Sequence, residues 1–211
     1  MSVQRDIARR VAGHLLDGEI VNLGIGIPTL VSDFLDADSG VVLQTENGML
    51  GVGPAPAEGE SDPALVNAGK LPITALPGAS FFSSSVSFGL IRGGHVTTSV
   101  LGALQVDTRG RIANWALPGR PILGVGGAMD LLVGARRVIA ATTHLTKDGE
   151  PKLVADCTLP LTAERPVDLV VTEAATFALR DSGLVLVEVA ASSDREWIAA
   201  HTAAPYAEDL P

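Results

Sequence analysis

The chain has 211 residues, of which 46% are hydrophobic, and a formal net charge of −9. This length can bury one hydrophobic core, so we expect a single domain over residues 1–211. The negative charge argues against binding to nucleic acid or to an anionic membrane surface, and no apolar run reaches the roughly 18 residues of a membrane-spanning helix. With Cys157 as the one cysteine and no signal-peptide pattern, we expect a cytoplasmic protein without a disulfide.

The first 45 residues predict a helix followed by a βαβ unit. Residues 3–16 carry apolar side chains at helical spacing. EIVNLGIG at 19–26 predicts a buried strand that runs into a glycine turn, and a helix is expected over 28–35. GVVLQT at 40–45 predicts the next strand. Because such crossovers are right-handed, the two strands should be parallel.

The rest of the chain predicts a long loop, several strands and a closing helix. Residues 51–70 are rich in Gly, Pro and acidic residues and indicate a surface loop, which at this length often has a function. The closing helix is expected near 192–202, where Ser193 and Glu196 have capping-box spacing. Strands are expected at 73–78, 95–107, 111–117, 136–144, 168–172 and, as a hairpin, 176–190. We therefore predict an α/β fold with an open, mostly parallel or mixed sheet flanked by helices.

Glu46 stands at the end of the strand predicted over 40–45, directly before an Asn-Gly turn. An acid at the carboxyl end of a parallel strand faces the crevice in which open α/β sheets bind ligands. Asn47 and Gly48, with glycines at 51 and 53, leave little side chain around this carboxylate. A loop carboxylate that faces water is the alternative, and the local residues leave both interpretations open.

The turn GIGIPT at 24–29 has some features of a dinucleotide-binding site. It follows a predicted strand, opens a helix and has Glu46 about twenty residues downstream, where a Rossmann protein binds the ribose. Thr29 stands in place of the third glycine, and Pro28 stiffens the turn. An NAD-binding oxidoreductase, with Glu46 as the ribose ligand, is therefore kept as the alternative function.

A second glycine cluster, GVGGAMDL, starts at residue 124 and precedes a helix-like run. Consecutive glycines such as Gly126 and Gly127 leave their amide N–H groups bare, and such donors can stabilise an oxyanion. A simple turn before a helix is the alternative interpretation.

Other polar residues give weaker signals. The serines at 83–85 lack a G-x-S-x-G elbow and suit a helix cap or a polar lining. Cys157 suits a small buried apolar position, and Lys70, at the end of NAGK, is either a solvated charge or a partner for a ligand phosphate or carboxylate. No metal site is expected, because the four histidines are far apart in the sequence and have no cysteine partners: His14, His95, His144 and His201.

Eight motifs occur here in the order found in family I coenzyme A transferases: VNLGIGIP, ENGMLGVGP, NAGK, LPGASFFSS, IRGGH, LGALQV, ANW and GGAMDL. Together with HLTKDGEPKLV and CTLPLT, they extend the resemblance from about residue 4 to about residue 190. The chain resembles the B (beta) subunit of a 3-oxoacid coenzyme A transferase. The segment LPGRPILG at 117–124 departs from the shared pattern and leaves the specificity open.

The resemblance implies an open α/β subunit, related to ribose-5-phosphate isomerase-like proteins, that pairs with a homologous A (alpha) subunit in an α2β2 or related assembly. It also implies that Glu46 is the nucleophile, that Gly127, with Gly126 beside it, is the oxyanion donor, and that Lys70 lies near the coenzyme. Coenzyme A is then a thioester substrate, with no permanently bound cofactor and no metal. The residues expected to line the pocket are Asn22, Gly24, Gly26, Asn47 and Gly48.

The reaction implied by the resemblance is ping-pong transfer of coenzyme A from succinyl-CoA to a 3-oxoacid through a glutamyl-CoA thioester on Glu46. HLTKDGEPKLV favours 3-oxoadipate as the acceptor and ANWALPG favours acetoacetate, so the acceptor stays open. A non-catalytic member of the family is a third hypothesis, and the presence of Glu46 argues against it.

Overall fold

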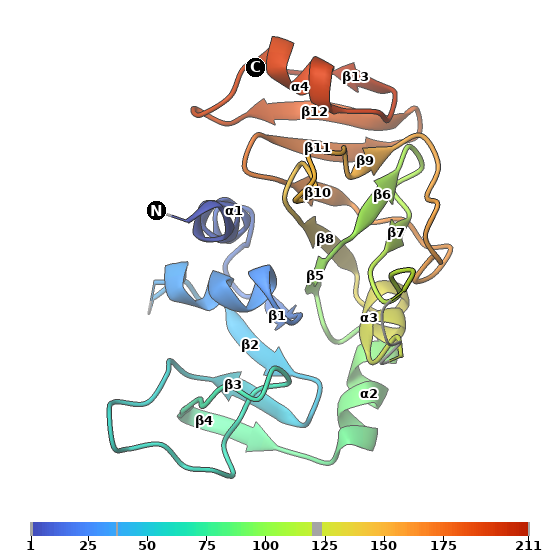
Figure 1. Ribbon diagram of the computed structural model, residues 1–211. Helices are drawn as coiled ribbons and strands as arrows, with labels where there is room; N and C mark the ends of the chain where they lie inside the picture. The colour runs from blue at the N-terminus through green and yellow to red at the C-terminus, as the bar shows by residue number, and fades with distance from the viewer. Residues whose placement is uncertain (1, 37, 120–123, 211) are drawn as a thin grey trace.

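The computed structural model describes residues 2–36, 38–119 and 124–210 (Figure 1). Its helices are α1 (Val3–Ala12), the 3₁₀-helix η1 (Ile27–Phe34), α2 (Ser84–Arg92), α3 (Ala128–Gly134) and α4 (Arg195–His201). Its strands are β1 (Ile20–Leu23), β2 (Val42–Thr45), β3 (Met49–Val52), β4 (Ala75–Phe81), β5 (Thr98–Gly102), β6 (Gln105–Asp107), β7 (Ile112–Ala113), β8 (Arg137–Ala141), β9 (Leu153–Val154), β10 (Leu169–Val171), β11 (Ala175–Arg180), β12 (Gly183–Val189) and β13 (Tyr206–Glu208).

A ten-stranded mixed sheet dominates the described residues. Its strand order is β13-β12-β11-β10-β8-β5-β1-β2-β3-β4, and β7-β6-β9 form a second, three-stranded sheet. The five central strands, from β10 to β2, are parallel to one another, and the strands next to them on either side are antiparallel. The predicted α/β fold with a mostly parallel or mixed sheet is therefore confirmed.

The predicted βαβ unit is present, with two differences in its helices. β1 and β2 are parallel, with Ile20 opposite Val42. The helix predicted over residues 3–16 already ends at Ala12, and Gly13 follows it as the C-cap. The segment predicted as a helix over 28–35 forms the 3₁₀-helix η1. Both helices cover one face of the sheet, where Ile7, Val11 and other apolar side chains form a buried cluster (Figure 1).

The loop predicted at 51–70 starts later than expected, because β3 turns back along β2. The Asn-Gly turn makes this hairpin possible. Gly48 has φ +123°, and a β-carbon there would also overlap with the carbonyl oxygen of Phe82, so glycine is required on two counts. β4 then pairs antiparallel with β3 and forms the edge of the large sheet.

The strand predicted over 95–107 is split between the two sheets. β5 ends at Gly102 in the large sheet, and β6 continues in the small one, where it pairs with β7 through the predicted TRG turn. The small sheet, α2 and α3 lie on the face of the large sheet opposite α1 and η1, and together they enclose the larger apolar cluster, which includes Ile91, Leu132 and Phe177.

The C-terminal part contains the predicted hairpin and one unpredicted strand. β11 and β12 pair antiparallel, and β13 adds to β12 in parallel. The cap of α4 differs from the prediction: the side chain of Asp194, and not Ser193, accepts from the amide of Trp197, at 2.8 Å. None of the described helices is long and apolar enough to cross a membrane.

Candidate active site

Glu46 directly follows β2 and points toward the face of the sheet that carries α2 and α3. Side chains alternate along a strand, so Glu46 lies on the same face as Gln44, which contacts Ser87 of α2. Its carboxylate reaches the residue before α3: a β-carbon on Gly127 would overlap with Oε2 of Glu46 and would lie 2.9 Å from its Cδ. The backbone of Gly127 is therefore in direct contact with the carboxylate, and only glycine leaves the room for it.

Two features of its surroundings make the Glu46 carboxylate more basic. Burial raises the pKa of Glu46 above its ordinary value, and the negative charge of Asp130 on α3 raises this pKa further. In the described part of the chain, no donor forms a hydrogen bond with this carboxylate. A half-buried carboxylate without hydrogen bonds retains its full electron density for attack on an electrophile.

Asp130 is itself paired with Arg92 at the end of α2. Nε of Arg92 donates to Oδ1 of Asp130 at 2.6 Å, and its guanidinium lies 5.7 Å above the centre of the Phe88 ring. Phe88 also approaches Gly127, with a ring carbon 3.2 Å from the position of a β-carbon there. α2 and α3 are thereby joined around Glu46.

A buried polar network supports the strand that ends at Glu46. Gln44 accepts from Nδ2 of Asn22 at 2.7 Å, and its own Nε2 donates to Ser87 Oγ at 2.7 Å and to the Thr45 carbonyl at 2.8 Å. Asn22 is only 2% exposed. Its side chain therefore braces β2 against β1, and in this conformation it does not offer a donor to a ligand.

The Asn-Gly turn after Glu46 is tied to the long loop. Oδ1 of Asn47 accepts from the hydroxyl of Thr45, and Nδ2 donates to the carbonyl of Val66 at 2.9 Å. Lys70 lies four residues further along this loop, with an exposed side chain and φ +62°. A β-carbon on the neighbouring Gly69 would lie 3.9 Å from Ile25, so the NAGK segment reaches the first glycine turn.

The first glycine turn lies beside Glu46 at the same edge of the sheet. The amide of Gly24 donates to the carbonyl of Val100 at 2.9 Å, which continues the pairing of β1 with β5. Gly26 precedes η1 with φ +95° and has no other described atom within 4 Å of its β-carbon position. The turn therefore presents backbone to the crevice, as the glycine pattern indicates.

These contacts bring together three of the predicted elements: Glu46, the cluster at Gly126 and Gly127, and the glycine turn. Gly126 has φ +57° and directly precedes the glycine that touches Glu46.

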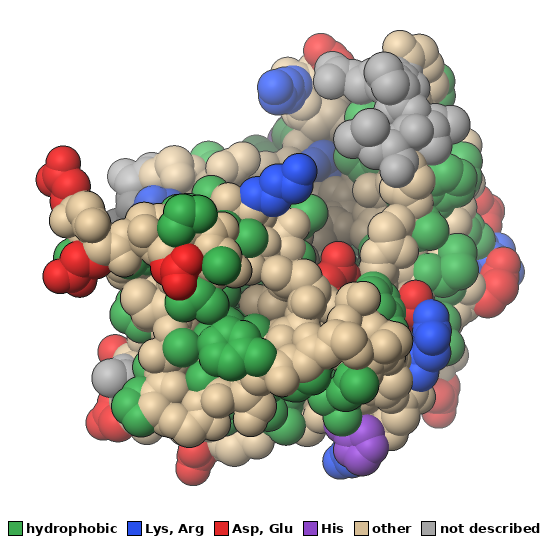
Figure 2. Space-filling model, turned by 90° about the horizontal axis from the view of Figure 1, so that it is seen from below, with side chains coloured by type: hydrophobic (Ala, Val, Ile, Leu, Met, Phe, Trp, Pro, Cys, Tyr) green, Lys and Arg blue, Asp and Glu red, His purple; other side chains and the backbone are tan. Residues whose placement is uncertain are grey.

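Residues 120–123 of the segment LPGRPILG, which departs from the shared pattern, lie outside the described residues. Figure 2, seen from the side of β3, β4 and α2, shows a hollow near the centre of the molecule, with an acidic side chain at its rim and basic side chains across from it.

Several residues around Glu46 escaped the sequence analysis. Phe88 and Asp130 lie near the carboxylate, Arg92 pairs with Asp130, and Ser87 supports the strand that ends at Glu46. The serines at 83–85 were expected to suit a helix cap, and Ser83 does cap α2 by accepting from the amide of Val86. Asp130 stands within the GGAMDL motif itself. The pairing of α2 with α3 is a contact between distant segments that no local pattern reveals.

The surroundings of His144 and Cys157 indicate a role in the folded structure and not in catalysis. Burial lowers the pKa of His144 to about 4, and its ring nitrogens contact the hydroxyls of Thr172 and Thr202, both at 3.0 Å. Burial raises the pKa of the Cys157 thiol to about 11, which makes it a poor nucleophile at neutral pH. Among the described residues, no group of three His, Cys, Asp or Glu side chains is arranged to hold a metal ion.

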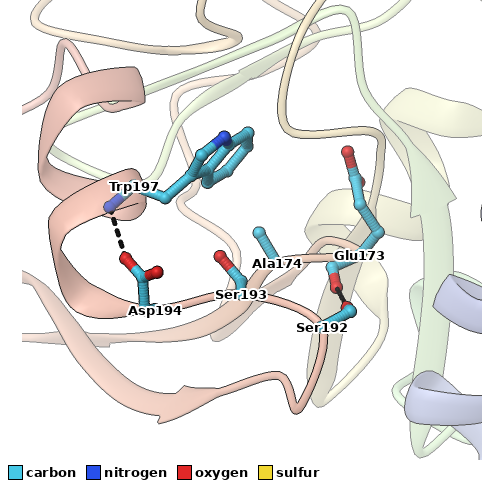
Figure 3. Close-up of a pocket in the computed structure, with 6 residues that line it drawn as sticks. All are labelled: Glu173, Ala174, Ser192, Ser193, Asp194 and Trp197. Atoms are coloured by element: carbon cyan, nitrogen blue, oxygen red, sulfur yellow. Dashed lines mark hydrogen bonds between the residues drawn. The ribbon is translucent and has the colours of Figure 1, made fainter.

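A separate cavity of about 170 Å³ lies at the C-terminal end, beside α4 (Figure 3). Figure 3 shows Asp194 capping Trp197 at one side, while the side chain of Glu173 points away from Ser192. The buried Oγ of Ser193 has no hydrogen-bond partner within the described ranges, which is a further departure from the predicted capping box. This cavity shares no lining residue with the surroundings of Glu46.

Comparison with known sequences supports the transferase interpretation. Residues 4–190 match the coenzyme A transferase family. The chain is 48% identical over 206 residues to the acetate CoA-transferase subunit beta of Escherichia coli K12, covering 98% of this chain and 94% of that one. It is 46% identical over 203 residues to the mitochondrial succinyl-CoA:3-ketoacid coenzyme A transferase 2B of Mus musculus, covering 95% of this chain and 39% of that one. This chain thus spans about two-fifths of the longer relative.

Solved structures show the same fold. The acyl-CoA transferase YdiF from Escherichia coli O157:H7 aligns with a TM-score of 0.77 at 21% identity, over 100% of this chain and 43% of that one. Glutaconate coenzyme A-transferase from Acidaminococcus fermentans aligns with a TM-score of 0.70 at 15% identity, over 99% and 89%. The decarboxylase AibA/AibB also aligns, with a TM-score of 0.72 at 20% identity over 99% and 86%, so the fold by itself does not define the reaction.

None of these matches supports the NAD-binding alternative, and the turn on which it rests leads into a 3₁₀-helix. The ordered motifs, the contact between Glu46 and the second glycine cluster, and the match over residues 4–190 agree with one another. The chain belongs to the coenzyme A transferase family.

Proposed function

We propose that this chain is the B subunit of an enzyme that moves coenzyme A between two carboxylic acids, with Glu46 as the covalent nucleophile. The observation that carries this proposal is the contact of the Glu46 carboxylate with the backbone of Gly127. It joins a basic, half-buried carboxylate to a segment of bare backbone, and these are the two components that acyl transfer through a carboxylate requires.

In the first step, an oxygen of Glu46 attacks the thioester carbonyl carbon of the acyl-CoA. The C–S bond breaks, the thiolate leaves with the electron pair, and an acyl-glutamyl anhydride forms. The raised pKa of Glu46 assists this attack, since a more basic carboxylate is a better nucleophile. The amides of Gly126 and Gly127 are the donors we propose for the negative charge that develops on the carbonyl oxygen.

In the second step, the coenzyme A thiolate attacks the glutamyl carbonyl carbon of the anhydride. The bond between Cδ of Glu46 and the bridging oxygen breaks, the first acid leaves as a carboxylate with that oxygen, and a glutamyl-CoA thioester remains on Glu46. A second carboxylate then runs both steps in reverse and leaves as the new acyl-CoA. The thioester energy is conserved throughout, so the proposed reaction uses no ATP.

The proposed partner is a homologous A subunit, in an α2β2 or related assembly. The relative of matching length is named a subunit beta, while the longer relative contains more than twice this length in one chain. Large apolar side chains are exposed on the elements around Glu46: Phe81 of β4, Val86 of α2, and Met129 and Val133 of α3. A second subunit over this surface would bury them, exclude water from the anhydride and add positive charge for the anionic coenzyme.

For the substrates, we propose succinyl-CoA as the donor and a 3-oxoacid, either acetoacetate or 3-oxoadipate, as the acceptor. A relative named for 3-ketoacids supports this pair, and the relative named for acetate adds a short acid to test. Lys70, on the exposed loop beside the glycine turn, is the proposed contact for the coenzyme. A cytoplasmic location stays a prediction.

The test is to assemble the chain with its A subunit, incubate the complex with succinyl-CoA without acceptor, and locate the modified residue by peptide mass spectrometry. We expect a coenzyme A adduct on Glu46 that disappears when acetoacetate or 3-oxoadipate is added. An adduct on any other residue, or transfer without an adduct, contradicts the proposal. The same complex with 3-oxoadipate, acetoacetate and acetate in turn identifies the acceptor.

A further inference from the structure

Lys152 is a cation with few partners, located just before β9. Its Nζ donates to the hydroxyl of Thr142 at 3.1 Å, and that hydroxyl donates to the carbonyl of Ala103 at 2.7 Å. An ammonium group has three donors, and in the described part of the chain no other hydrogen bond and no ion pair of this group is present. Lys152 therefore has unused donors in a partly buried place.

Its charge is compensated only at longer range. Burial lowers the pKa of Lys152, and the negative charge of Glu173 partly offsets this. The Glu173 carboxylate accepts from the amide of His144 at 3.0 Å and forms no ion pair with Lys152 in the described ranges. A partly buried ammonium with one neutral partner is stabilised when an anion binds to it.

The ammonium lies at the same edge of the sheet as Glu46 and on the same face. Thr142 directly follows β8, as Glu46 directly follows β2, and these strands are parallel members of one sheet. Along β8, the side chain of Ala140 points into the cluster beneath α3, so by alternation Thr142 points to that face too, which is the face of Glu46.

Small residues stand at the ends of the two strands between Glu46 and Lys152. From β2 to β8 the sheet passes through β1 and β5, whose ends are formed by Gly24, by Gly102 and by Ala103, the residue that Thr142 contacts. With strands about 4.8 Å apart, the strand of Thr142 is about 14 Å from that of Glu46. The Glu46 side chain and a four-carbon acyl group bonded to it together span most of this distance.

We propose that the Lys152 ammonium binds the remote carboxylate of a dicarboxylic acyl group while the thioester carbonyl of that group lies at Glu46. The inference rests on the proposed function and adds a specificity site for the donor acid. A carboxylate of the acyl group fits better than a phosphate of the coenzyme, because the phosphates lie beyond the pantetheine arm and the exposed Lys70 is available for them.

The test compares donors with and without the remote carboxylate in the assembled enzyme. For Lys152→Met we expect kcat/KM with succinyl-CoA to fall by about 10–100-fold, because a charge-assisted hydrogen bond is lost, and kcat/KM with acetyl-CoA to change less than about threefold. Lys152→Arg should restore part of the succinyl-CoA activity. The matched control is Lys147→Met, which removes an exposed lysine from the same loop and should change neither value.

An equal loss with both donors, or no loss with either, overturns the inference. If Lys152→Met does not assemble, the Arg variant and Thr142→Val, which removes the one neutral partner, provide the same comparison of donors. A coenzyme A adduct on Glu46 in the wild type, measured in parallel, separates the two proposals. If the adduct is present and the Lys152 variants change kcat/KM equally with both donors, only the role of Lys152 is rejected. If the adduct is absent in the wild type, the proposed function is rejected.

Discussion

Two carboxylates on the same side of the large sheet have opposite surroundings. Asp107, at the end of β6, is fully buried, yet it accepts from the amides of Arg109 and Arg111, both at 3.0 Å, and pairs with the guanidinium of Arg111 at 2.7 Å. Glu46 is half-buried, accepts no hydrogen bond from the described residues, and lies against the backbone of Gly127.

The difference separates a carboxylate that holds structure from one that is available for chemistry. A buried acid that is fully paired stabilises the turn in which it lies, since each of its oxygens replaces lost water contacts. An acid left without donors makes the folded state less stable and more reactive at that point. Substitutions at the two positions should therefore have opposite effects on stability and activity.

The largest effect is expected for Glu46→Gln, which keeps the shape and removes the nucleophile. Transfer in the assembled enzyme should fall by at least about 10⁴-fold. Because the folded-state pKa of Glu46 is raised, its ionised form costs stability at pH above that pKa, so the variant should unfold at the same temperature or higher. Steady-state kinetics and thermal unfolding at pH 7 check both parts. Unchanged turnover rejects the role of Glu46.

Asp107→Asn should lower the stability of the protein and leave its activity nearly unchanged. Removing one partner of a buried ion pair typically costs about 3–5 kcal/mol, although Arg111 retains Glu164 at 3.1 Å, so we expect a loss near the lower end, about 3 kcal/mol. Urea denaturation measures this loss, and kcat of the folded fraction should stay within about twofold of the wild type. A stable variant with impaired kcat would make the contrast between the two acids wrong.

Gly127→Ala should act on activity in the same direction as Glu46→Gln, but less strongly. The new methyl group would overlap with the Glu46 carboxylate and displace it from the amides beside it, so we expect a loss of about 10²–10³ in kcat. The matched control is Gly89→Ala in α2, where a β-carbon has no neighbour within 4 Å and activity should be unchanged. Equal activity of the two variants contradicts the geometry proposed for the oxyanion.

The smallest effect is expected on the pH profile. Glu46 must be ionised to attack, so kcat/KM should fall as the pH drops through its raised pKa. Asp130→Asn removes one cause of that raised pKa and should move the acidic limb of the profile to lower pH. Arg92→Met leaves Asp130 unpaired and should move the limb to higher pH. Shifts in the same direction for both variants would exclude Asp130 as a source of the effect.

Much of the site was predictable because its elements are local in sequence. The apolar run over 40–45 predicted a strand that ends directly before Glu46, and the Asn-Gly turn followed from its residue types. The roles of Glu46 and Gly127 came from the resemblance to coenzyme A transferases, while the local residues had left a solvated acid and a simple turn open. The contact between Glu46 and Gly127 is where the structure adds an independent observation.

Other features were not predictable, because they depend on contacts between distant segments. Ser193 and Asp194 are both acceptable caps by residue type, and the path of the chain into α4 decided for Asp194. β13 pairs with β12 through only three residues, Tyr206, Ala207 and Glu208, whose pattern is too short to indicate a strand.

The sequence by itself determined the α/β class, the parallel β1 and β2, and the position of an acid at the carboxyl edge of the sheet. These follow from the spacing of apolar residues and from the order of strand, helix and strand along the chain. The tertiary structure decided what surrounds that acid. α2 and α3 meet through Arg92 and Asp130, Gly127 is brought to the Glu46 carboxylate, and Lys152 reaches the same edge from the small sheet. Burial and charge at a site are set by segments that are distant in the sequence, so only the packed chain defines them.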